Sequence, residues 1–276
     1  MMRLADAFAA AGSDARAALI GYLPAGFPDR ETAHELVRAM VRGGVGIVEV
    51  GMPYSDPVMD GPAIQRASDV SLAAGTTLAD AIDVVRTAAQ EGAAACLMSY
   101  WNPIARYGLE RFCQDFAAAG GTAVITPDLS PEEAGDWVRL TDAHGISRVF
   151  LIAPSSTDAR LALVAGTCNG FVYAASMMGV TGNDAVIGDV ARQLVSRARA
   201  VTSLPVAVGL GIRAADQVRS VAQFADGVIV GSAFVRAVEE STAPAAAVAA
   251  VEALARELAT GTARGSVPAP VEGGMK

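Results

Sequence analysis

Short, almost continuously apolar runs recur along the chain and alternate with longer stretches of helical periodicity. Runs of about four to eight apolar residues are typical of parallel β-strands that are buried on both faces. Such runs lie at Ala18–Leu23, Ile47–Gly51, Ala94–Ser99, Thr122–Thr126, Arg148–Ile152, Phe171–Ala174, Val206–Gly209 and Gly227–Val230. The alternation favours folds in which each strand is followed by a helix.

The stretches between the runs carry helix start and stop signals. Asp29 is suited to cap a helix that ends at Gly43-Gly44. Thr77-Leu78-Ala79-Asp80 has the pattern of a capping box, with aspartate in the place of glutamate. Ser130-Pro131-Glu132-Glu133 predicts another helix start, with two acids at the positive end of the helix dipole. A further helix is predicted from residue 184 or 185 to residue 200.

Eight strands alternating with helices over about 250 residues predict an α/β fold, a single-domain (β/α)8 TIM barrel. We place the catalytic barrel at residues 1–260, with a doubly wound open sheet as the alternative. The chain has 276 residues, 52% of them hydrophobic, which is enough for a substantial core. The segment 261–276 is rich in Gly, Pro and Ala, and we expect it to be a flexible C-terminal tail.

Charge and cysteine content exclude several classes of function. The net charge is −8 and the basic residues are scattered, which argues against a surface for nucleic acid or anionic membranes. Cys96, Cys113 and Cys168 have neither disulfide-framework nor zinc spacing. No stretch approaches the roughly 20 apolar residues of a membrane span.

The N-terminal residues also give no sign of a targeting segment. Asp6 comes early and no long apolar run precedes it, so we expect no signal peptide and a cytoplasmic location.

The scarcity of lysine and histidine restricts the chemistry further. The only lysine is Lys276, and the only histidines are His34 and His144, both at positions that suit solvated or helix-terminal side chains. A Schiff base needs a desolvated lysine at the reacting centre, so we expect neither pyridoxal phosphate in this chain nor an imine-forming aldolase. Two separated histidines are too few for a zinc aldolase, so no metal is expected. Catalysis must therefore depend on carboxylates, hydroxyls and backbone amides.

Glu49 is a carboxylate within an otherwise apolar strand. It lies near the carboxyl end of the second predicted strand, between Val48 and Val50, and this end of a barrel is its catalytic face. Burial should raise its pKa towards neutrality, which suits a group that both gives and takes a proton. A structural carboxylate that caps a neighbouring loop is the other interpretation, and position alone does not decide between them.

The loop from Met52 to Pro62 has three prolines, two aspartates and a glycine. Its rigidity suggests that Asp56 and Asp60 are held in place rather than solvated at random. Asp60-Gly61-Pro62 also has the form of an ordinary turn before a helix. Spacing alone favours that turn role for Asp60.

Three glycine-containing turns follow the sixth, seventh and eighth predicted strands. They are Gly179-Val180-Thr181-Gly182, Gly209-Leu210-Gly211-Ile212 and Gly231-Ser232-Ala233. Barrels often bind phosphate with the loops after strands seven and eight, where backbone N–H groups and a helix N-terminus face the anion. These turns are therefore candidates for a phosphate site that needs no lysine. Tyr22 and Met98, near other strand ends, could line an apolar pocket or pack the barrel rim, and the residues alone favour the rim.

Together these pieces resemble the α subunit of tryptophan synthase over about residues 1–260. The most specific part runs from Glu49 to Pro57 and continues with Asp60-Gly61-Pro62. The segments that reinforce it are Pro24-Ala25-Gly26-Phe27-Pro28-Asp29, Tyr100-Trp101-Asn102-Pro103-Ile104, Tyr107-Gly108, Thr126-Pro127-Asp128-Leu129, Phe171-Val172-Tyr173 and the first two glycine turns. Pro24, Met59 and Met177-Met178 depart from the commonest pattern of that family, but none of them removes a catalytic group.

The resemblance implies a lyase of aromatic amino acid (tryptophan) biosynthesis that cleaves indole-3-glycerol phosphate to indole and D-glyceraldehyde 3-phosphate by a retro-aldol step. It makes Glu49 the general acid and base and Asp60 the partner of the indole nitrogen. The supporting residues that it implies are Tyr173 beside the reacting centre, Thr181 on a closing loop, Tyr22 and Met98 in the indole pocket, and Gly182, Gly211, Gly231 and Ser232 at the phosphate.

The resemblance also implies a β-subunit partner that bears pyridoxal phosphate, in an assembly of two α and two β subunits. Pro53, Asp56, Asn102 and Pro103 would face that subunit. Two alternatives stay open: another phosphate-binding barrel enzyme, such as a sugar-phosphate isomerase or indole-glycerol-phosphate synthase, and a barrel kept only as an activating subunit. Indole-glycerol-phosphate synthase should show an active-site lysine, which is missing here. A catalytic assay of the isolated chain tests whether the barrel is only an activating subunit.

Overall fold

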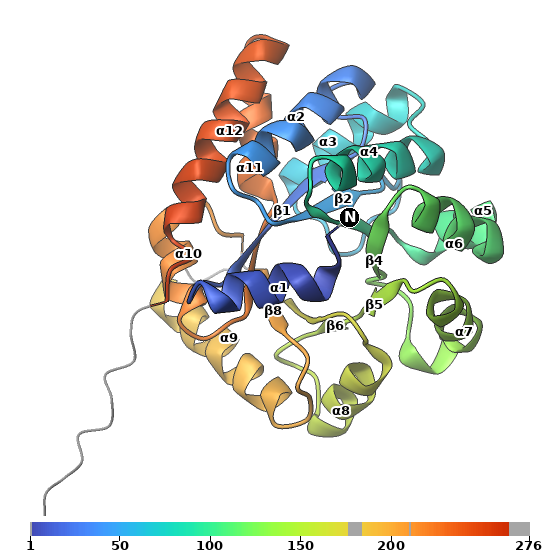
Figure 1. Cartoon of the computed structure of the whole chain (residues 1–276), viewed down its shortest axis with the longest axis vertical. Helices are drawn as coiled ribbons and strands as arrows, with labels where there is room; N and C mark the ends of the chain where they lie inside the picture. Colours follow the sequence, from blue (N-terminus) through green and yellow to red (C-terminus); the bar gives the residue numbers. More distant parts are fainter. Residues whose placement is uncertain (1, 176–183, 210, 265–276) are drawn as a thin grey trace, which may run out of the picture.

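The computed structural model describes residues 2–175, 184–209 and 211–264 and arranges their strands as a parallel barrel surrounded by helices (Figure 1). The strands are β1 (Ala18–Pro24), β2 (Ile47–Gly51), β3 (Ala94–Met98), β4 (Gly121–Ile125), β5 (Ser147–Val149), β6 (Leu151–Ile152), β7 (Val172–Ala175), β8 (Val206–Gly209) and β9 (Gly227–Val230). Their order in the sheet is β5-β4-β3-β2-β1-β9-β8-β7-β6. Because only Phe150 separates β5 from β6 in the chain, this order describes a nearly closed ring. The predicted (β/α)8 barrel is confirmed, and the open doubly wound sheet is wrong.

The fifth predicted strand differs from its prediction because it is split. The run 148–152 was expected to be one strand, but the backbone N–H of Phe150 donates to Sγ of Cys168 at 3.3 Å and does not continue the ladder of β5. Pairing with β4 therefore ends at Val149, and pairing with β7 begins at Leu151. The other predicted strands are confirmed to within one residue at each end.

The helices follow the strands in the expected alternation. Their bounds are α1 (Leu4–Ser13), α2 (Arg30–Arg42), α3 (Pro62–Ala73), α4 (Leu78–Gln90), α5 (Trp101–Tyr107), α6 (Leu109–Ala118), α7 (Gly135–Ala143), α8 (Asp158–Thr167), α9 (Asp184–Arg199), α10 (Ala215–Ala222), α11 (Ser232–Glu239) and α12 (Pro244–Thr260), with a 3-10 turn η1 (Pro131–Glu133). None of these helices, within the described ranges, combines the length and the apolarity needed to cross a membrane.

Three of the four predicted helix starts are confirmed, and the fourth, after Ser130, begins only a 3-10 turn. The helix predicted from residue 184 or 185 is α9, which begins at Asp184. Asp29 accepts a hydrogen bond from the backbone N–H of Thr32 and caps α2, and Thr77 and Asp80 form the capping box of α4. Ser130 is the N-cap residue of η1 alone, and its hydroxyl donates to the Glu133 carboxylate instead of accepting from a backbone N–H. The residues after it form only η1, and α7 begins afterwards at Gly135.

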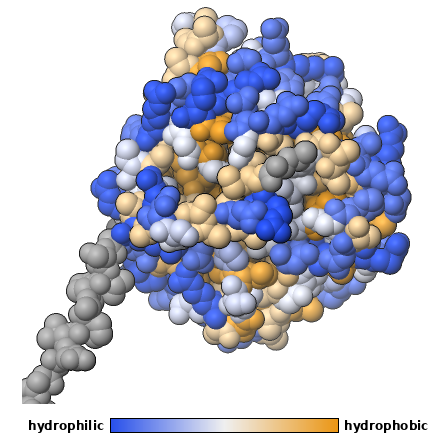
Figure 2. Space-filling view, in the orientation of Figure 1, coloured by the Kyte–Doolittle hydropathy of each residue, from blue (hydrophilic) through white to orange (hydrophobic). Residues whose placement is uncertain are grey.

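The barrel interior is closed at its amino-terminal end by α1, which lies across the front of the barrel in Figure 1. Leu4, Ala7 and Phe8 of α1 join one buried cluster with Ile20 of β1 and with Phe171, directly before β7. The rings of Phe8 and Phe171 lie 5.6 Å apart. Burying one such aromatic side chain is worth about 1.5–3 kcal/mol. A second cluster fills the space between the outward strand faces and the surrounding helices. Hydrophilic side chains cover much of the face that carries α1, and only small apolar areas lie between them (Figure 2).

The start of the predicted tail is attached to the barrel. Thr262 is buried, its carbonyl accepts the N–H of Ala17, and the guanidinium of Arg264 donates to the carbonyl of Ala225 at 2.8 Å. Residues 262–264, which the sequence assigns to the tail, are thus bonded to the barrel, and residues 265–276 lie outside the described part.

Candidate active site

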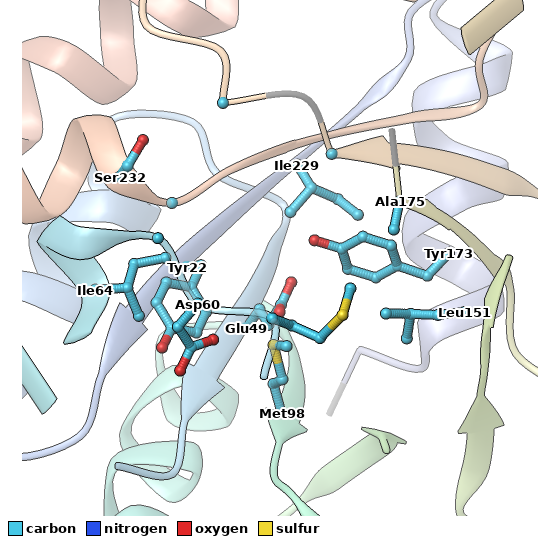
Figure 3. Close-up of a pocket in the computed structure, with 15 residues that line it drawn as sticks. Tyr22, Glu49, Asp60, Ile64, Met98, Leu151, Tyr173, Ala175, Ile229 and Ser232 are labelled. Carbon is cyan, nitrogen blue, oxygen red and sulfur yellow. The ribbon is translucent and has the colours of Figure 1, made fainter. Parts of the chain in front are cut away.

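A cavity of about 270 Å³ opens at the carboxyl ends of the strands. Figure 3 shows the side chains that line it. Strands β1, β2, β3, β6, β7, β8 and β9, or the turns directly after them, contribute to its wall. The lining residues are Tyr22, Glu49, Met59, Asp60, Gly61, Ile64, Met98, Leu151, Tyr173, Ala175, Gly209, Gly211, Ile229, Gly231 and Ser232. The carboxyl ends are where barrel enzymes have their active sites.

Glu49 reaches this cavity because of the alternation along β2. Ile47 belongs to the cluster inside the barrel, whereas Val48 and Val50 belong to the cluster under the helices, so Glu49 points inward. The side chain is 1% exposed, and its Oε2 has no hydrogen-bond partner within the described residues. Burial, with a smaller contribution from the charge of Asp60, raises the pKa of Glu49 to about 8. The carboxyl group therefore carries a proton at neutral pH.

Asp60 approaches the cavity from the loop between β2 and α3. Burial raises its pKa to about 6, and a hydrogen bond from Tyr100 opposes that rise. At neutral pH this carboxyl group is therefore mainly ionised, in contrast to Glu49. Two carboxyl groups whose environments separate their pKa values are the arrangement in which one serves as acid and the other as an anion.

Contacts from two segments, one near and one distant in the sequence, hold the loop that carries Asp60. The backbone N–H groups of Val58 and Met59 donate to the Tyr100 hydroxyl at 3.1 and 3.0 Å. The side chain of Gln65 donates to the Asp60 carbonyl at 2.7 Å. Gly61 is the N-cap residue of α3 and Pro62 its first residue, so the predicted turn before a helix is confirmed. That turn also brings the Asp60 side chain to the cavity.

Tyr22 and Tyr173 form opposite parts of the wall, and each packs beside a glycine (Figure 3). A Cβ at Gly51 would collide with the ring of Tyr22, and one at Gly209 would come within 2.7 Å of the Tyr173 hydroxyl. Burial raises the pKa of both phenols well above their ordinary value, so both stay neutral. Tyr22 and Met98 line the cavity, whereas the residues alone had favoured packing at the rim.

The glycine turns after β8 and β9 also reach the cavity. Gly211 lines it with a φ of +68°, a conformation that L side chains rarely adopt, and Gly231 lines it directly before α11. Ser232 is the first residue of α11, and its Oγ accepts a hydrogen bond from Arg236 at 3.2 Å. Thr181 and Gly182, predicted for the closing loop and the phosphate, lie outside the described residues.

Comparisons with known proteins agree with this geometry. The family model for the tryptophan synthase alpha chain matches residues 8–263. The alpha chain of Thermobifida fusca is 55% identical over 92% of this chain and 95% of its own length. That of Acidothermus cellulolyticus is 52% identical over 96% of this chain and 98% of its own length. A crystal structure of Mycobacterium tuberculosis tryptophan synthase matches with a TM-score of 0.88 and 47% identity, over 95% of this chain and 99% of the matched one.

The chain belongs to the tryptophan synthase alpha chain family. It is therefore a lyase that catalyses the α reaction in tryptophan biosynthesis, and the predicted family and enzyme class are confirmed. In this alpha chain no group of three or more His, Cys, Asp and Glu side chains could hold a metal ion, as far as the described residues extend. His34 bonds Thr87 between α2 and α4, and His144 contacts Glu110 between α7 and α6; neither lines the cavity.

The residues expected at a subunit interface lie on two neighbouring segments of the alpha chain. Asp56 and Asn102 are exposed, Pro103 is half-buried, and Pro53 is buried within this chain. The rings of Tyr54 and Tyr100 stack at 4.8 Å and so connect the loop after β2 to the start of α5.

Sequence reasoning missed several lining residues of the alpha chain. Leu151, Ala175 and Ile229 sit near the carboxyl ends of strands and could have been found from the strand positions alone. Met59 and Ile64 flank the turn at Asp60, and no local signal distinguishes them from packing residues.

Proposed function

We propose that Glu49 and Asp60 perform the α reaction of this chain, the retro-aldol cleavage of indole-3-glycerol phosphate to indole and D-glyceraldehyde 3-phosphate. The observation that carries the proposal is one cavity lined by two carboxyl groups, with the pKa of Glu49 near 8 and that of Asp60 near 6. At neutral pH the first group has a proton to give, and the second has a negative charge to offer.

The reaction begins with a proton transfer. The carboxylic acid of Glu49 protonates C3 of the indole ring, which leaves an indolenine with positive charge at the ring nitrogen. The Asp60 carboxylate accepts a hydrogen bond from that N–H and stabilises the charge. The indolenine is an electron sink within the substrate, which fits a chain whose only lysine is Lys276.

The second step breaks the carbon–carbon bond. The Glu49 carboxylate, now ionised, takes the proton of the hydroxyl group on the carbon attached to the ring. The C–O bond becomes the aldehyde carbonyl, the bond to C3 breaks, and its electrons return to the ring as neutral indole. Glu49 ends the cycle protonated, as it began. The Oε2 of Glu49 has no partner among the described residues, which supports this role, because a buried carboxyl oxygen without a partner is costly unless a ligand uses it.

The rest of the cavity suits the two ends of the substrate. Tyr22, Met98, Leu151 and Tyr173 offer an apolar wall for the indole ring, with both phenols neutral. Backbone N–H groups at Gly211, Gly231 and Ser232, with the positive end of the α11 dipole, suit the phosphate. Gly182 and Thr181 would add to the phosphate site and to the closing loop.

The alpha chain acts with a β subunit, and we place Asp56, Asn102 and Pro103 at the contact between them. Pro53 is buried, and its role there would be to fix the loop that carries Asp56. Pyridoxal phosphate belongs to the β subunit in this proposal, and the assembly has two α and two β subunits in the cytoplasm. Indole released by the alpha chain would pass to that cofactor.

The deciding experiment is an assay of indole release from indole-3-glycerol phosphate by the isolated chain, with and without a β subunit. We expect release by the wild type and a loss of about 10²–10⁴-fold in Glu49→Gln, with substrate binding retained. Glu110→Gln changes an exposed glutamate of α6 in the same way and should leave turnover unchanged. A wild-type chain that releases no indole under either condition would favour the activating-subunit alternative. Near-normal release by Glu49→Gln would remove Glu49 from the mechanism.

A further inference from the structure

Tyr100 occupies a junction that the mechanism above does not use. It lies between β3 and α5, and its side chain reaches the loop between β2 and α3. Its ring is buried and stacks on that of Tyr54, with centroids 4.8 Å apart. Its hydroxyl oxygen accepts the N–H groups of Val58 and Met59, the two residues directly before Asp60. One side chain thus holds the segment from which Asp60 projects.

The hydrogen-bonding capacity of a phenol determines where the Tyr100 proton goes. A phenolic oxygen can accept hydrogen bonds and has one proton to donate. The amides of Val58 and Met59 occupy its acceptor side at 3.1 and 3.0 Å, so neither of them can receive that proton. The carboxyl group of Asp60 follows directly in the chain, and the Tyr100 side chain lies close enough to lower its pKa. An ionised carboxylate is the stronger acceptor, so the donated proton favours the ionised form.

We propose that Tyr100 is a positioning residue for Asp60: clamped by the amides of Val58 and Met59, its hydroxyl donates its proton to the Asp60 carboxylate, aims it into the cavity and keeps it ionised. This deepens the proposed function, on which it rests, since it requires Asp60 to act as an anion. The two amides and the carboxylate form one unit with the hydroxyl at its centre.

Other titratable groups also act on this unit. Among the described residues, those that face Asp60 or Tyr100 are Glu49 from β2, Tyr22 from β1, Tyr173 from β7 and Asp128 from the turn after β4. Glu49 is protonated at neutral pH and the tyrosines are neutral, and among these described groups Tyr100 is the one whose side chain lowers the pKa of Asp60. Removing the Tyr100 hydroxyl should therefore raise the pKa of Asp60.

The test is the pH profile of kcat/KM for indole formation in Tyr100→Phe. The substitution removes the hydroxyl and keeps a ring that can stack on Tyr54. Activity falls on the acid side as Asp60 takes up a proton, and loss of a donor to the carboxylate raises its pKa. We expect the acid limb to move to higher pH by about 0.5–1 unit, with the alkaline limb of Glu49 much less affected.

Tyr107→Phe is the matched control. Tyr107 lies on α5, and its hydroxyl donates to the Asp115 carboxylate at 2.6 Å, away from the cavity. Tyr107→Phe also removes a tyrosine hydroxyl that lies beside an aspartate carboxylate. The acid and alkaline limbs of its pH profile should both stay where they are in the wild type. If Tyr100→Phe lowers activity equally at all pH values, with both limbs unmoved, Tyr100 only supports the fold and the inference is wrong.

A second variant keeps the question answerable if Tyr100→Phe does not fold. Fluorotyrosine at position 100 retains the ring and the hydroxyl but makes the phenol a stronger donor, so the acid limb should move to lower pH. An unmoved acid limb in a folded fluorotyrosine enzyme contradicts the inference. Failure of the proposed function would look different, because the wild type itself would then release no indole at any pH.

Discussion

Strand β2 and the loop that follows it each bring one carboxyl group to the cavity, but they hold these groups by different means. Glu49 is fixed by the pleat of a strand buried on both faces and is 1% exposed. Asp60 depends on contacts from outside its loop, chiefly Tyr100 and Gln65. The difference is chemical as well as structural, because the strand residue has the higher pKa and the loop residue the lower one. The protonated group thus belongs to a strand, and the ionised group belongs to a loop that contacts from other segments hold in place.

The largest effect should come from removing both groups. If they act on one transition state, Glu49→Gln combined with Asp60→Asn should lose little more activity than Glu49→Gln alone, about 10²–10⁴-fold, because groups that work as a unit are not additive. Single-turnover indole release by the two single variants and the double variant measures this. Losses that multiply would mean that strand and loop act independently.

The strand carboxyl should also affect stability in a pH-dependent way. The pKa of Glu49 is about 8 in the folded chain against 4.5 ordinarily, so the folded state retains a proton that the unfolded state releases. Stability therefore falls as pH rises between these values and levels off above them. Glu49→Gln should remove this loss and be more stable than the wild type near pH 9, with little gain near pH 4.

Asp60→Asn is the matched comparison for that effect. The pKa of Asp60 is about 6 in the folded chain against 3.8 ordinarily, so its carboxyl group lowers stability over a narrower range of pH, between these two values. Urea unfolding of the wild type and both variants across pH separates the two windows. Equal windows for both variants would show that the strand and the loop desolvate their carboxyl groups alike.

The pH profile of kcat/KM for the wild type tests whether Glu49 and Asp60 differ in protonation as described. The reaction needs Asp60 ionised and Glu49 protonated, so kcat/KM should rise as pH passes about 6 and fall as it passes about 8. A single limb, or an optimum well above the Glu49 pKa, would contradict the assignment of acid and anion. Measurement with and without a β subunit shows whether a partner moves the acid limb alone, as expected if contact alters the loop rather than the strand.

The same contrast explains what the sequence could predict. The inward direction of Glu49 follows from alternation within one strand, which is local information. Asp60 looked like a turn residue because its fixing partner, Tyr100, is about 40 positions away in the sequence, and only the family resemblance supplied its role. The split of the fifth strand likewise depends on a distant group, Sγ of Cys168. Local patterns predicted the barrel, whereas contacts between loops that are far apart in sequence decided the details of its rim.

Met59 provides the smallest and most specific test of the loop. It lies next to Asp60, lines the cavity and is 39% exposed, whereas its backbone N–H is held by Tyr100. Its side chain is thus the movable part of a fixed segment, and a thioether can pack on an aromatic ring with a gain of about 0.3–1.5 kcal/mol. Met59→Ala should therefore raise KM for indole-3-glycerol phosphate by about 2–10-fold and leave kcat and the acid limb unchanged.

Substrates with a substituted indole ring make that test sharper. Because Met59→Ala enlarges the cavity, ring-substituted indole-glycerol phosphates should lose less in kcat/KM than the unsubstituted substrate does. Met98→Ala, from the rigid wall at β3, serves as the comparison, because it removes the same side chain from the cavity without touching the loop. If Met59→Ala lowers kcat rather than raising KM, while Met98→Ala does not, the loop holds Asp60 through its side-chain packing as well as through its backbone. The separation between a fixed backbone and a movable side chain at Met59 would then be wrong.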